Sequence, residues 1–190
     1  NLSSIKGLHL TGIDYNRLRL ERVSKALPGV GLIEGDLSMS PFRKPFDIIL
    51  LNQVIEHVAD DLNLLKELRQ ILSNNGILIL GTPNEGSFLQ QSWIRRQGKA
   101  FETDHVQFYT EQDIRRQIDK AGFHIDSVLR EVFFIGSYNL YYWLTKRKWG
   151  FRFLELMTRL FPKECSDYYF ECHPKPELSQ DVKDVEPGSK

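Results

Sequence analysis

The strongest constraint on the fold comes from residues 46–58, where four aliphatic residues in a row are followed directly by polar ones. Residues 48–51 show no alternation of apolar and polar positions, which predicts a strand buried on both faces, like a central strand of a parallel sheet. Asn52 and Gln53 then place polar side chains at the carboxyl end of this strand. Ligands of open α/β sheets bind at that edge, so the pattern is half of a nucleotide-binding layout. An ordinary buried strand with a polar loop explains this stretch alone equally well.

Strand and helix patterns alternate along the first half of the chain. Each short apolar strand pattern there leads to a helical one with its apolar residues on one face, or to a turn. We expect strands at 8–13, 30–34 and 77–80, helices at 15–27 and 61–73, and a helix C-cap at 74–76. Short links between alternating strands and helices predict βαβ units and a parallel sheet, so the predicted fold class is α/β.

The second half of the chain is less regular. Thr110 and Asp113 form a capping-box pattern, which predicts the start of a helix. The expected elements are helices at 88–96 and 110–121 and strands at 123–134 and 167–173. We expect one domain at 1–176 and a polar tail at 177–190.

Charge and cysteine content limit the class of partner. Lys+Arg and Asp+Glu are both 25, so the formal net charge is zero. Electrostatic binders of nucleic acid usually carry a basic excess, so we expect no nucleic-acid partner. Cys165 and Cys172 form no Cys-x-x-Cys pair, which argues against a zinc site or a disulfide framework and fits a reducing, cytoplasmic compartment. The longest apolar stretch, 132–144, is too short and too interrupted to span a bilayer.

Five short motifs follow one another in a defined order. They are Gly12-Ile13-Asp14, Glu34-Gly35-Asp36, Phe46-Asp47 through Glu56-His57-Val58, Asn75-Gly76 before a strand, and His105-Val106-Gln107-Phe108-Tyr109-Thr110 leading to Ala121-Gly122-Phe123. In this order, residues 8–130 resemble the class I S-adenosylmethionine-dependent methyltransferases, and especially the small-molecule branch that includes the ubiquinone and menaquinone biosynthesis methyltransferases. The resemblance implies a Rossmann-like, doubly wound, mostly parallel sheet with an antiparallel last strand.

One part of that family pattern is missing. The family's first strand and its Gly-x-Gly-x-Gly loop should lie upstream of Asp14, but only thirteen residues precede Asp14, and Gly7 and Gly12 are their only glycines. We therefore expect a domain truncated at its amino end.

The resemblance implies S-adenosylmethionine as the cofactor, bound at the strand ends. Asp14 could accept hydrogen bonds from both ribose hydroxyls, or it is a carboxylate favoured near a helix N-terminus. Asp36 would meet the adenine amino group, or it belongs to an ordinary Gly-Asp turn. The expected cofactor-binding residues are Asp14, Tyr15, Asp36, Leu37, Asn52 and Gln53. The same ribose geometry would serve NAD.

Two histidines are the candidate catalytic residues. Glu56 and His57 could face the substrate. His57 could then serve as a general base, since an imidazole titrates near neutral pH, or it could pack under a loop and hydrogen-bond the backbone. His105 resembles the family histidine over the substrate pocket, with an acid–base or a loop-fixing role. We expect no metal ligands, and His9, His124 and His173 are interpreted as structural or exposed.

A helical insertion is expected at 136–163, before the last strand. Residues 138–161 combine many aromatic side chains with Lys and Arg. Such a segment could cover its own sheet, form a lid over a lipophilic substrate, or rest on a membrane surface as a peripheral contact.

These features predict S-adenosylmethionine-dependent methyl transfer to a small-molecule acceptor, which the aromatic insertion allows to be lipophilic. The transfer is an in-line displacement, so the protein would mainly align the reactants and exclude water. One alternative is a methyltransferase-like binding or scaffold module without catalysis. A nucleotide-binding oxidoreductase of the NAD type is a further alternative, disfavoured because nothing after residues 46–58 indicates a hydride-transfer site.

Overall fold

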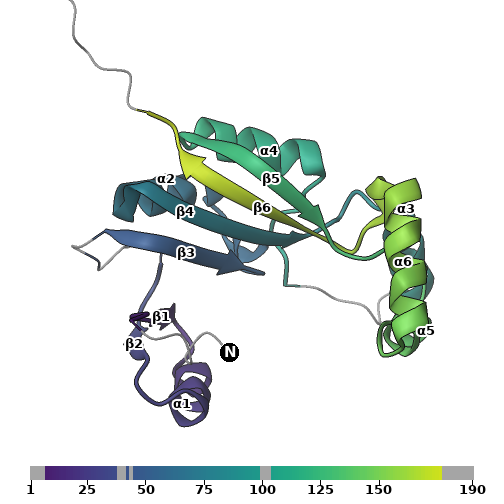
Figure 1. The fold of residues 1–190 in the computed structure, drawn as a ribbon, viewed down its shortest axis with the longest axis horizontal. Helices are drawn as coiled ribbons and strands as arrows, with labels where there is room; N and C mark the ends of the chain where they lie inside the picture. Colours follow the sequence, from purple (N-terminus) through teal and green to yellow (C-terminus); the bar gives the residue numbers. More distant parts are fainter. Residues whose placement is uncertain (1–6, 38–41, 43–44, 99–103, 177–190) are drawn as a thin grey trace, which may run out of the picture.

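The structure is a computed structural model that describes residues 7–37, 42, 45–98 and 104–176. The tail expected at 177–190 lies outside these residues. Within the described part, the chain forms two β-sheets and six α-helices (Figure 1). None of these helices is long and apolar enough to cross a membrane.

The smaller sheet contains the first two strands. β1 (Thr11–Asp14) pairs in parallel with β2 (Gly31–Glu34), and α1 (Arg17–Ala26) connects them. The side chain of Asn16 caps α1 by accepting hydrogen bonds from two backbone N–H groups of its first turn. The three elements pack chiefly on one another and form the βαβ unit that the sequence predicts.

The larger sheet has the strand order β3-β4-β6-β5. Its strands are β3 (Phe46–Asn52), β4 (Leu72–Pro83), β5 (Phe123–Arg130) and β6 (Asp167–Pro174). β3 and β4 are parallel, whereas β6 runs antiparallel to both of its neighbours. The mixed sheet with an antiparallel last strand confirms the predicted fold class.

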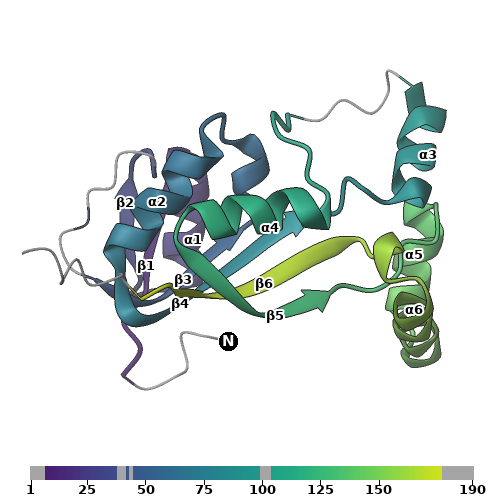
Figure 2. The ribbon, with the colours of Figure 1, turned by 90° about the horizontal axis from the view of Figure 1, so that it is seen from above.

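Two helices form a layer on the larger sheet. Seen from above in Figure 2, α2 (Asp61–Ile71) and α4 (Glu111–Lys120) lie side by side over it. Their apolar stripes and the covered sheet face make the main core, which includes Leu64, Leu65, Leu68, Leu78, Leu80, Ile114, Ile118, Phe123 and Phe170. The capping box predicted at Thr110 is present, because its hydroxyl accepts from Asp113 N and the Asp113 carboxylate accepts from Thr110 N.

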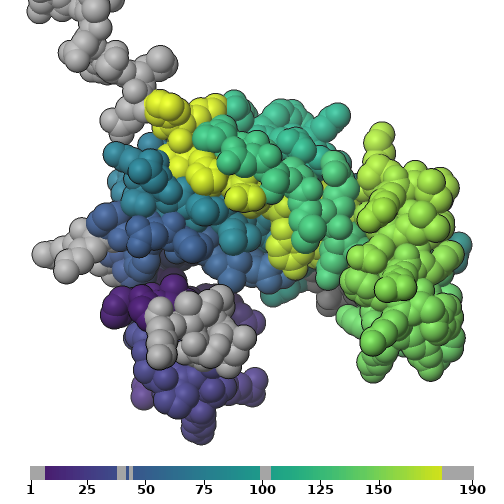
Figure 3. All heavy atoms as spheres, viewed as in Figure 1, coloured from purple at the N-terminus to yellow at the C-terminus, as the bar shows by residue number. Residues whose placement is uncertain are grey.

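The prediction that residues 48–51 are buried on both faces is wrong. β3 lies at the edge of its sheet and, among the described residues, pairs only with β4. The edge of β3 faces the separate β1–β2 sheet, and the space-filling view shows a hollow between the two parts (Figure 3). Ile48 and Leu50 are 55% and 59% exposed, whereas Leu51 is buried in the main core and Ile49 packs against it. Since successive side chains of a strand point to opposite faces, Ile48 and Leu50 lie on the sheet face opposite the main core.

Two predicted boundaries also differ. Residues 74–76 are not a helix C-cap, because β4 begins at Leu72 directly after α2 and already includes them. Gly76 has no positive φ and lies against the Leu72 side chain, so it serves close packing rather than a turn. The strand expected at 123–134 ends at Arg130, and beyond it Phe133 makes only an isolated bridge to Cys165.

The insertion folds into two helices, α5 (Tyr138–Thr145) and α6 (Lys148–Leu160), as predicted. Together with α3 (Phe88–Gln97) they stand at one end of the larger sheet (Figures 1 and 2). A second apolar cluster holds them there; its buried members are Val132, Phe133, Phe134, Tyr141, Leu144 and Leu154. The Trp93 ring of α3 meets the Tyr138 ring edge-on at 4.6 Å between centroids, which joins α3 to α5.

Candidate functional site

The carboxyl ends of β3 and β4 lie side by side, because the two strands are parallel and Asn52 pairs with Gly81. A Cβ at Gly81 would overlap Asn52 Oδ1 and the Tyr169 ring, so glycine lets the Asn52 side chain lie across the strand end. Gln53 follows with φ of 54°, a left-handed conformation that is uncommon for a residue with a side chain. Its amide nitrogen donates to Asp167 Oδ1 at 2.9 Å. The polar shelf predicted at the end of β3 is therefore present and held in place.

Glu56 occupies the short 3-10 turn Ile55–His57 that follows this shelf. Its backbone carbonyl accepts from Val106 N and Gln107 N, which ties the turn to the segment after residue 104. Its side chain is 1% exposed, and neither carboxylate oxygen has a hydrogen-bond partner among the described residues. Burial raises the pKa of Glu56, an effect that its own backbone N–H group and the two nearby histidines oppose.

Both predicted catalytic histidines lie beside Glu56. The rings of His57 and His105 meet edge-on with centroids 4.9 Å apart. His57 Nε2 lies 3.9 Å from Glu56 Oε1, and its Nδ1 lies 3.4 Å from the backbone oxygen of Asp104. His105 Nδ1 lies 3.0 Å from Glu85 Oε1. The structure thus brings together two histidines that are far apart in sequence. It also adds Glu85, a buried carboxylate that the sequence analysis did not identify, and shows that Glu56 is buried.

A second pair of carboxyl groups, Glu131 and Asp167, lies next to the shelf. Burial, followed by a hydrogen bond with Asp167, raises the pKa of Glu131 to about 7, although Ser166 Oγ donates to it at 3.0 Å. Asp167 Oδ1 also accepts a hydrogen bond from the side-chain amide of Gln53. Because Glu131 and Asp167 are far apart in the sequence, no local pattern indicates that they form a pair.

The raised pKa of Glu131 predicts a pH dependence of stability. The folded state holds the proton more tightly than the unfolded state, so the contribution of Glu131 is most favourable below about pH 4.5 and is lost as pH rises to about 7. Urea unfolding of the parent and of Glu131→Gln should therefore show the parent losing stability relative to the variant across this window. Glu155→Gln, on the exposed side of α6, controls for removing one carboxylate. Parallel pH profiles for parent and Glu131→Gln would contradict the assignment.

The predicted adenosine-side residues lie on the smaller sheet. Asp14 ends β1, where its Oδ1 accepts from Asn16 N at 2.7 Å and its Oδ2 lies 3.7 Å from Arg19. Asp14 therefore contacts the start of α1, as its alternative role near a helix N-terminus predicts. Its carboxylate stays partly exposed at the strand end. Tyr15 is 75% exposed. These residues pack with α1 and β2 rather than with the Glu56 turn.

Asp36 and Leu37 follow β2, at the same edge of the smaller sheet as Asp14. Leu37 packs against the main core and so connects this edge to the larger body. A carboxylate at the end of each parallel strand fits a ligand with hydroxyl and amino donors, such as an adenosine moiety. The described residues therefore fit the adenosine side of S-adenosylmethionine, and Asn52 and Gln53 offer polar atoms at the next strand end.

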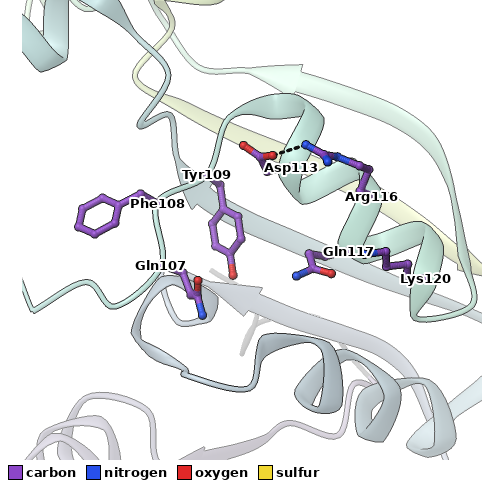
Figure 4. Close-up of a pocket in the computed structure, with 7 residues that line it drawn as sticks. All are labelled: Gln107, Phe108, Tyr109, Asp113, Arg116, Gln117 and Lys120. Atoms are coloured by element: carbon purple, nitrogen blue, oxygen red, sulfur yellow. Dashed lines mark hydrogen bonds and ion pairs between the residues drawn. The ribbon is translucent and has the colours of Figure 1, made fainter.

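The pocket drawn in Figure 4 is a different feature. It lies between α4 and the segment before it and is lined by Gln107, Phe108, Tyr109, Asp113, Arg116, Gln117 and Lys120. Behind it, Tyr109 Oη donates to the buried Asp61 carboxylate at 2.5 Å, and Gln117 Nε2 donates to the same group. This network joins α2 to α4, so we assign it a structural role.

Comparisons with known proteins agree with this layout. Residues 2–128 match a family described as a methyltransferase domain. The trans-aconitate 2-methyltransferase of Rhizobium etli is 31% identical over 75 residues, which are 40% of this chain and 29% of that protein. The ubiquinone biosynthesis O-methyltransferase of Cereibacter sphaeroides is 31% identical over 83 residues, 40% of this chain and 34% of that one. The matched part therefore spans about a third of these relatives' length.

Solved structures share the fold. An S-adenosylmethionine-dependent methyltransferase of Thermotoga maritima, described as a possible histamine N-methyltransferase, has a TM-score of 0.63 at 20% identity, over 87% of this chain and 73% of that one. Magnesium protoporphyrin IX methyltransferase of Synechocystis, solved with S-adenosylhomocysteine bound, has a TM-score of 0.57 at 14% identity, over 89% and 65% of the two chains. The architecture is thus that of Rossmann-like methyltransferases. The chain belongs to the methyltransferase-domain family.

Proposed function

We propose that the protein transfers a methyl group from S-adenosylmethionine to a small-molecule acceptor held at the carboxyl edge of β3 and β4. The observation that carries this proposal is the group of Glu56, His57 and His105 directly beyond the polar shelf. S-adenosylmethionine supplies an electrophilic methyl group on a sulfonium. The chain's own residues would orient the acceptor and take up its proton, a task for which an imidazole suits neutral pH. Glu85, hydrogen-bonded to His105, would hold that ring in position.

The charges around this site favour one class of acceptor. Glu56 lies beside His57 and Glu85 contacts His105, while the charge of Asp167 acts on Glu56. A polycarboxylate would be repelled there, so we place the acceptor among neutral or cationic molecules with a hydroxyl or amine group. The aromatic cluster of Trp93 and Tyr138 stands beside the same carboxylates, since Asp167 and Glu85 both act on the pKa of Tyr138. That proximity supports an acceptor with a lipophilic part.

Methyl transfer from labelled S-adenosylmethionine by the full-length protein, tested on a panel of hydroxyl- and amine-bearing acceptors, would test the proposal. His105→Gln should lower kcat and leave cofactor affinity unchanged. Cofactor binding without turnover on any acceptor would favour the non-catalytic scaffold instead. Absence of cofactor binding by the full-length protein would overturn the proposal.

Asp14 provides a quantitative prediction for the cofactor side. In the full-length protein, Asp14→Ala should weaken S-adenosylmethionine binding by about 1.5–3 kcal/mol, because hydrogen bonds to a charged group are lost. That is roughly a 10- to 150-fold rise in Kd by calorimetry. Asp126→Ala, on β5, is the control and should leave the affinity unchanged. Unchanged affinity for Asp14→Ala together with lower folding stability would make Asp14 a helix-terminal residue only.

We further propose that α5 and α6 contact a lipid surface. Residues 138–161 carry five Lys or Arg residues and one Glu. Many of their large apolar side chains are exposed: Leu140, Tyr142, Trp143, Trp149, Phe151, Phe153, Leu156, Leu160 and Phe161. The other faces of the two helices, with Tyr141, Leu144 and Leu154, pack against the domain itself, so this packing does not explain the exposed apolar side chains. Aromatic residues beside basic ones suit the interface of an anionic membrane.

A further inference from the structure

The three residues of the proposed acceptor site form a compact set of ligand atoms. One atom from each of Glu56, His57 and His105 lies within 4.8 Å of the other two. Two backbone hydrogen bonds to the Glu56 carbonyl hold the turn of Glu56 and His57 against the segment that carries His105. The cluster is thus part of the folded framework of the larger body rather than an accident of loose side chains.

Glu56 is the independent sign that a ligand belongs here. Its carboxylate is 1% exposed, and both oxygens lack a hydrogen-bond partner among the described residues. A buried carboxylate without hydrogen bonds is costly, and proteins usually resolve that cost with a proton, a cation or a metal. The oxygens face two imidazoles, which are also metal ligands in their neutral form.

Each histidine is supported from the side away from this centre. Glu85 Oε1 lies 3.0 Å from His105 Nδ1, and the Asp104 carboxylate lies 3.4 Å from His57 Nδ1. In metal sites, a carboxylate on one ring nitrogen fixes the ring and leaves the other nitrogen as the ligand. The same carboxylates make the surroundings negative, which favours a cation.

We propose that Glu56, His57 and His105 bind a divalent metal ion of the Zn²⁺ class, with a fourth position open to water or acceptor. One carboxylate and two imidazoles are a ligand set typical of catalytic zinc. Zn–ligand bonds of about 2.0–2.1 Å place tetrahedral ligand atoms roughly 3.3 Å apart. The three ligand atoms now lie within 4.8 Å of one another, so small side-chain rotations would bring them to this spacing. The partly exposed His57 side chain has room to rotate. This inference departs from the expectation, based on cysteine content, that the chain holds no metal.

The metal would have a specific task in the proposed reaction. Through its open position, the metal ion would bind the acceptor's oxygen and lower the pKa of the acceptor's hydroxyl. With the metal bound, the two imidazoles would be ligands instead of bases, and the hydroxyl would release its proton to water. This task rests on the proposed methyl transfer. Metal binding itself does not, since it needs neither cofactor nor acceptor and uses residues of the larger body only.

A second histidine pair serves as a matched control. His124 and His173 lie opposite each other on β5 and β6, and both contact Asp126, at 2.9 and 3.2 Å. This group contains the same residue types, but it is more exposed, and Asp126 is already paired with both rings. A metal that merely adheres to surface histidines would be lost when these two are replaced.

The test uses the full chain without a histidine tag, freed of metal with a chelator and then desalted. Titration with Zn²⁺ by calorimetry should give one equivalent per chain, and Co²⁺ should give the visible absorption of a four-coordinate site. Glu85→Gln should weaken Zn²⁺ binding by about 10- to 100-fold, as loss of such a supporting carboxylate does, and Glu56→Gln by at least as much. The double variant His124→Ala/His173→Ala should bind like the parent.

Thermal unfolding separates loss of the site from loss of the fold. Metal-free Glu56→Gln should be at least as stable as the metal-free parent, because it removes a buried carboxylate that has no hydrogen bond. Zn²⁺ should raise the Tm of the parent and not that of Glu56→Gln. The proposal is overturned if Zn²⁺ does not bind stoichiometrically, if Glu56→Gln binds it like the parent, or if only the His124/His173 variant loses it.

Discussion

Replacing Phe170 with alanine is expected to lower the free energy of unfolding by about 3–5 kcal/mol, the usual cost of truncating a buried phenylalanine. Phe170 is completely buried in the middle of β6. It pairs with Leu80 on β4 and with Val128 on β5, so its ring lies where the antiparallel strand is held between its neighbours. Domains of this kind are stable by about 5–15 kcal/mol, so the variant would lose a large share of the total.

The matched control is Leu129→Ala on the adjacent strand. Leu129 pairs with Tyr169, one residue from Phe170, but points to the open side and is 65% exposed. Its replacement should change the stability by no more than about 0.5 kcal/mol. Urea unfolding followed by fluorescence would measure both variants. Equal losses for the two would show that the β6 face seen here is not the core of the protein in solution.

Local patterns predicted those elements whose causes are local. The helix at Thr110 follows from a capping box in which both hydrogen bonds join residues three apart, so the sequence contains all the information needed. The amphipathic stripe of α2 is similar, since Leu64, Leu65 and Leu68 are all buried.

Predictions failed where a distant neighbour decides the outcome. The exposure of Ile48 depends on whether its face of the sheet is covered, which four aliphatic residues in a row cannot reveal. The Asn-Asn-Gly stretch at 74–76 has turn composition, yet the chain enters β4 at Leu72 directly after α2, and this stretch forms an irregularity in the strand before regular pairing with β3 begins at Ile77. Propensity is a weak prior that tertiary pairing overrides.

In the candidate site, too, some features could be predicted from local residue types and others depend on distant neighbours. His57 and His105 could be selected as residue types suited to proton transfer, and the structure brings them together. Glu56 could be named as a residue facing the substrate, but its burial without a hydrogen-bond partner could not be predicted, because contacts across the fold decide it. The left-handed conformation of Gln53 is likewise a consequence of the sheet edge and its bond to Asp167. The residues that could not be predicted are therefore those defined by contacts across the fold.

The last prediction concerns the exposed face of α6. Trp149, Phe153, Leu156 and Leu160 are spaced i, i+4, i+7 and i+11, so they form one stripe along the helix, and all four are exposed. The buried residues Gly150 and Leu154 lie on another face, which packs toward α5. The helix thus has a continuous apolar face with no partner among the described residues. Single apolar residues scattered over a surface are normal, but a continuous stripe of them indicates an interaction site.

Basic residues flank that stripe and suit an anionic surface. Arg152 and Arg159 lie beside it on the helix wheel, and Lys146, Arg147 and Lys148 precede it. The Arg147 guanidinium lies 3.8 Å from the centre of the Trp143 ring, which shows basic and aromatic groups intermixed at this surface. We expect the stripe to enter the headgroup region while these cations meet anionic lipids.

The triple variant Trp149→Ser/Phe153→Ser/Leu156→Ser is therefore expected to reduce binding to anionic vesicles by at least about 100-fold, since each large apolar side chain that leaves water contributes about 1.5–3 kcal/mol. Flotation with phosphatidylglycerol-containing vesicles measures the effect, and neutral phosphatidylcholine vesicles should bind the parent more weakly. The control Leu18→Ser/Leu129→Ser removes two exposed leucines elsewhere and should float like the parent. If the parent does not float, or if the triple variant floats equally well, the stripe does not bind lipid. A raised acceptor KM in the triple variant would then assign α6 to the lid over the acceptor, because the helix stands at the end of the sheet where the proposed site lies.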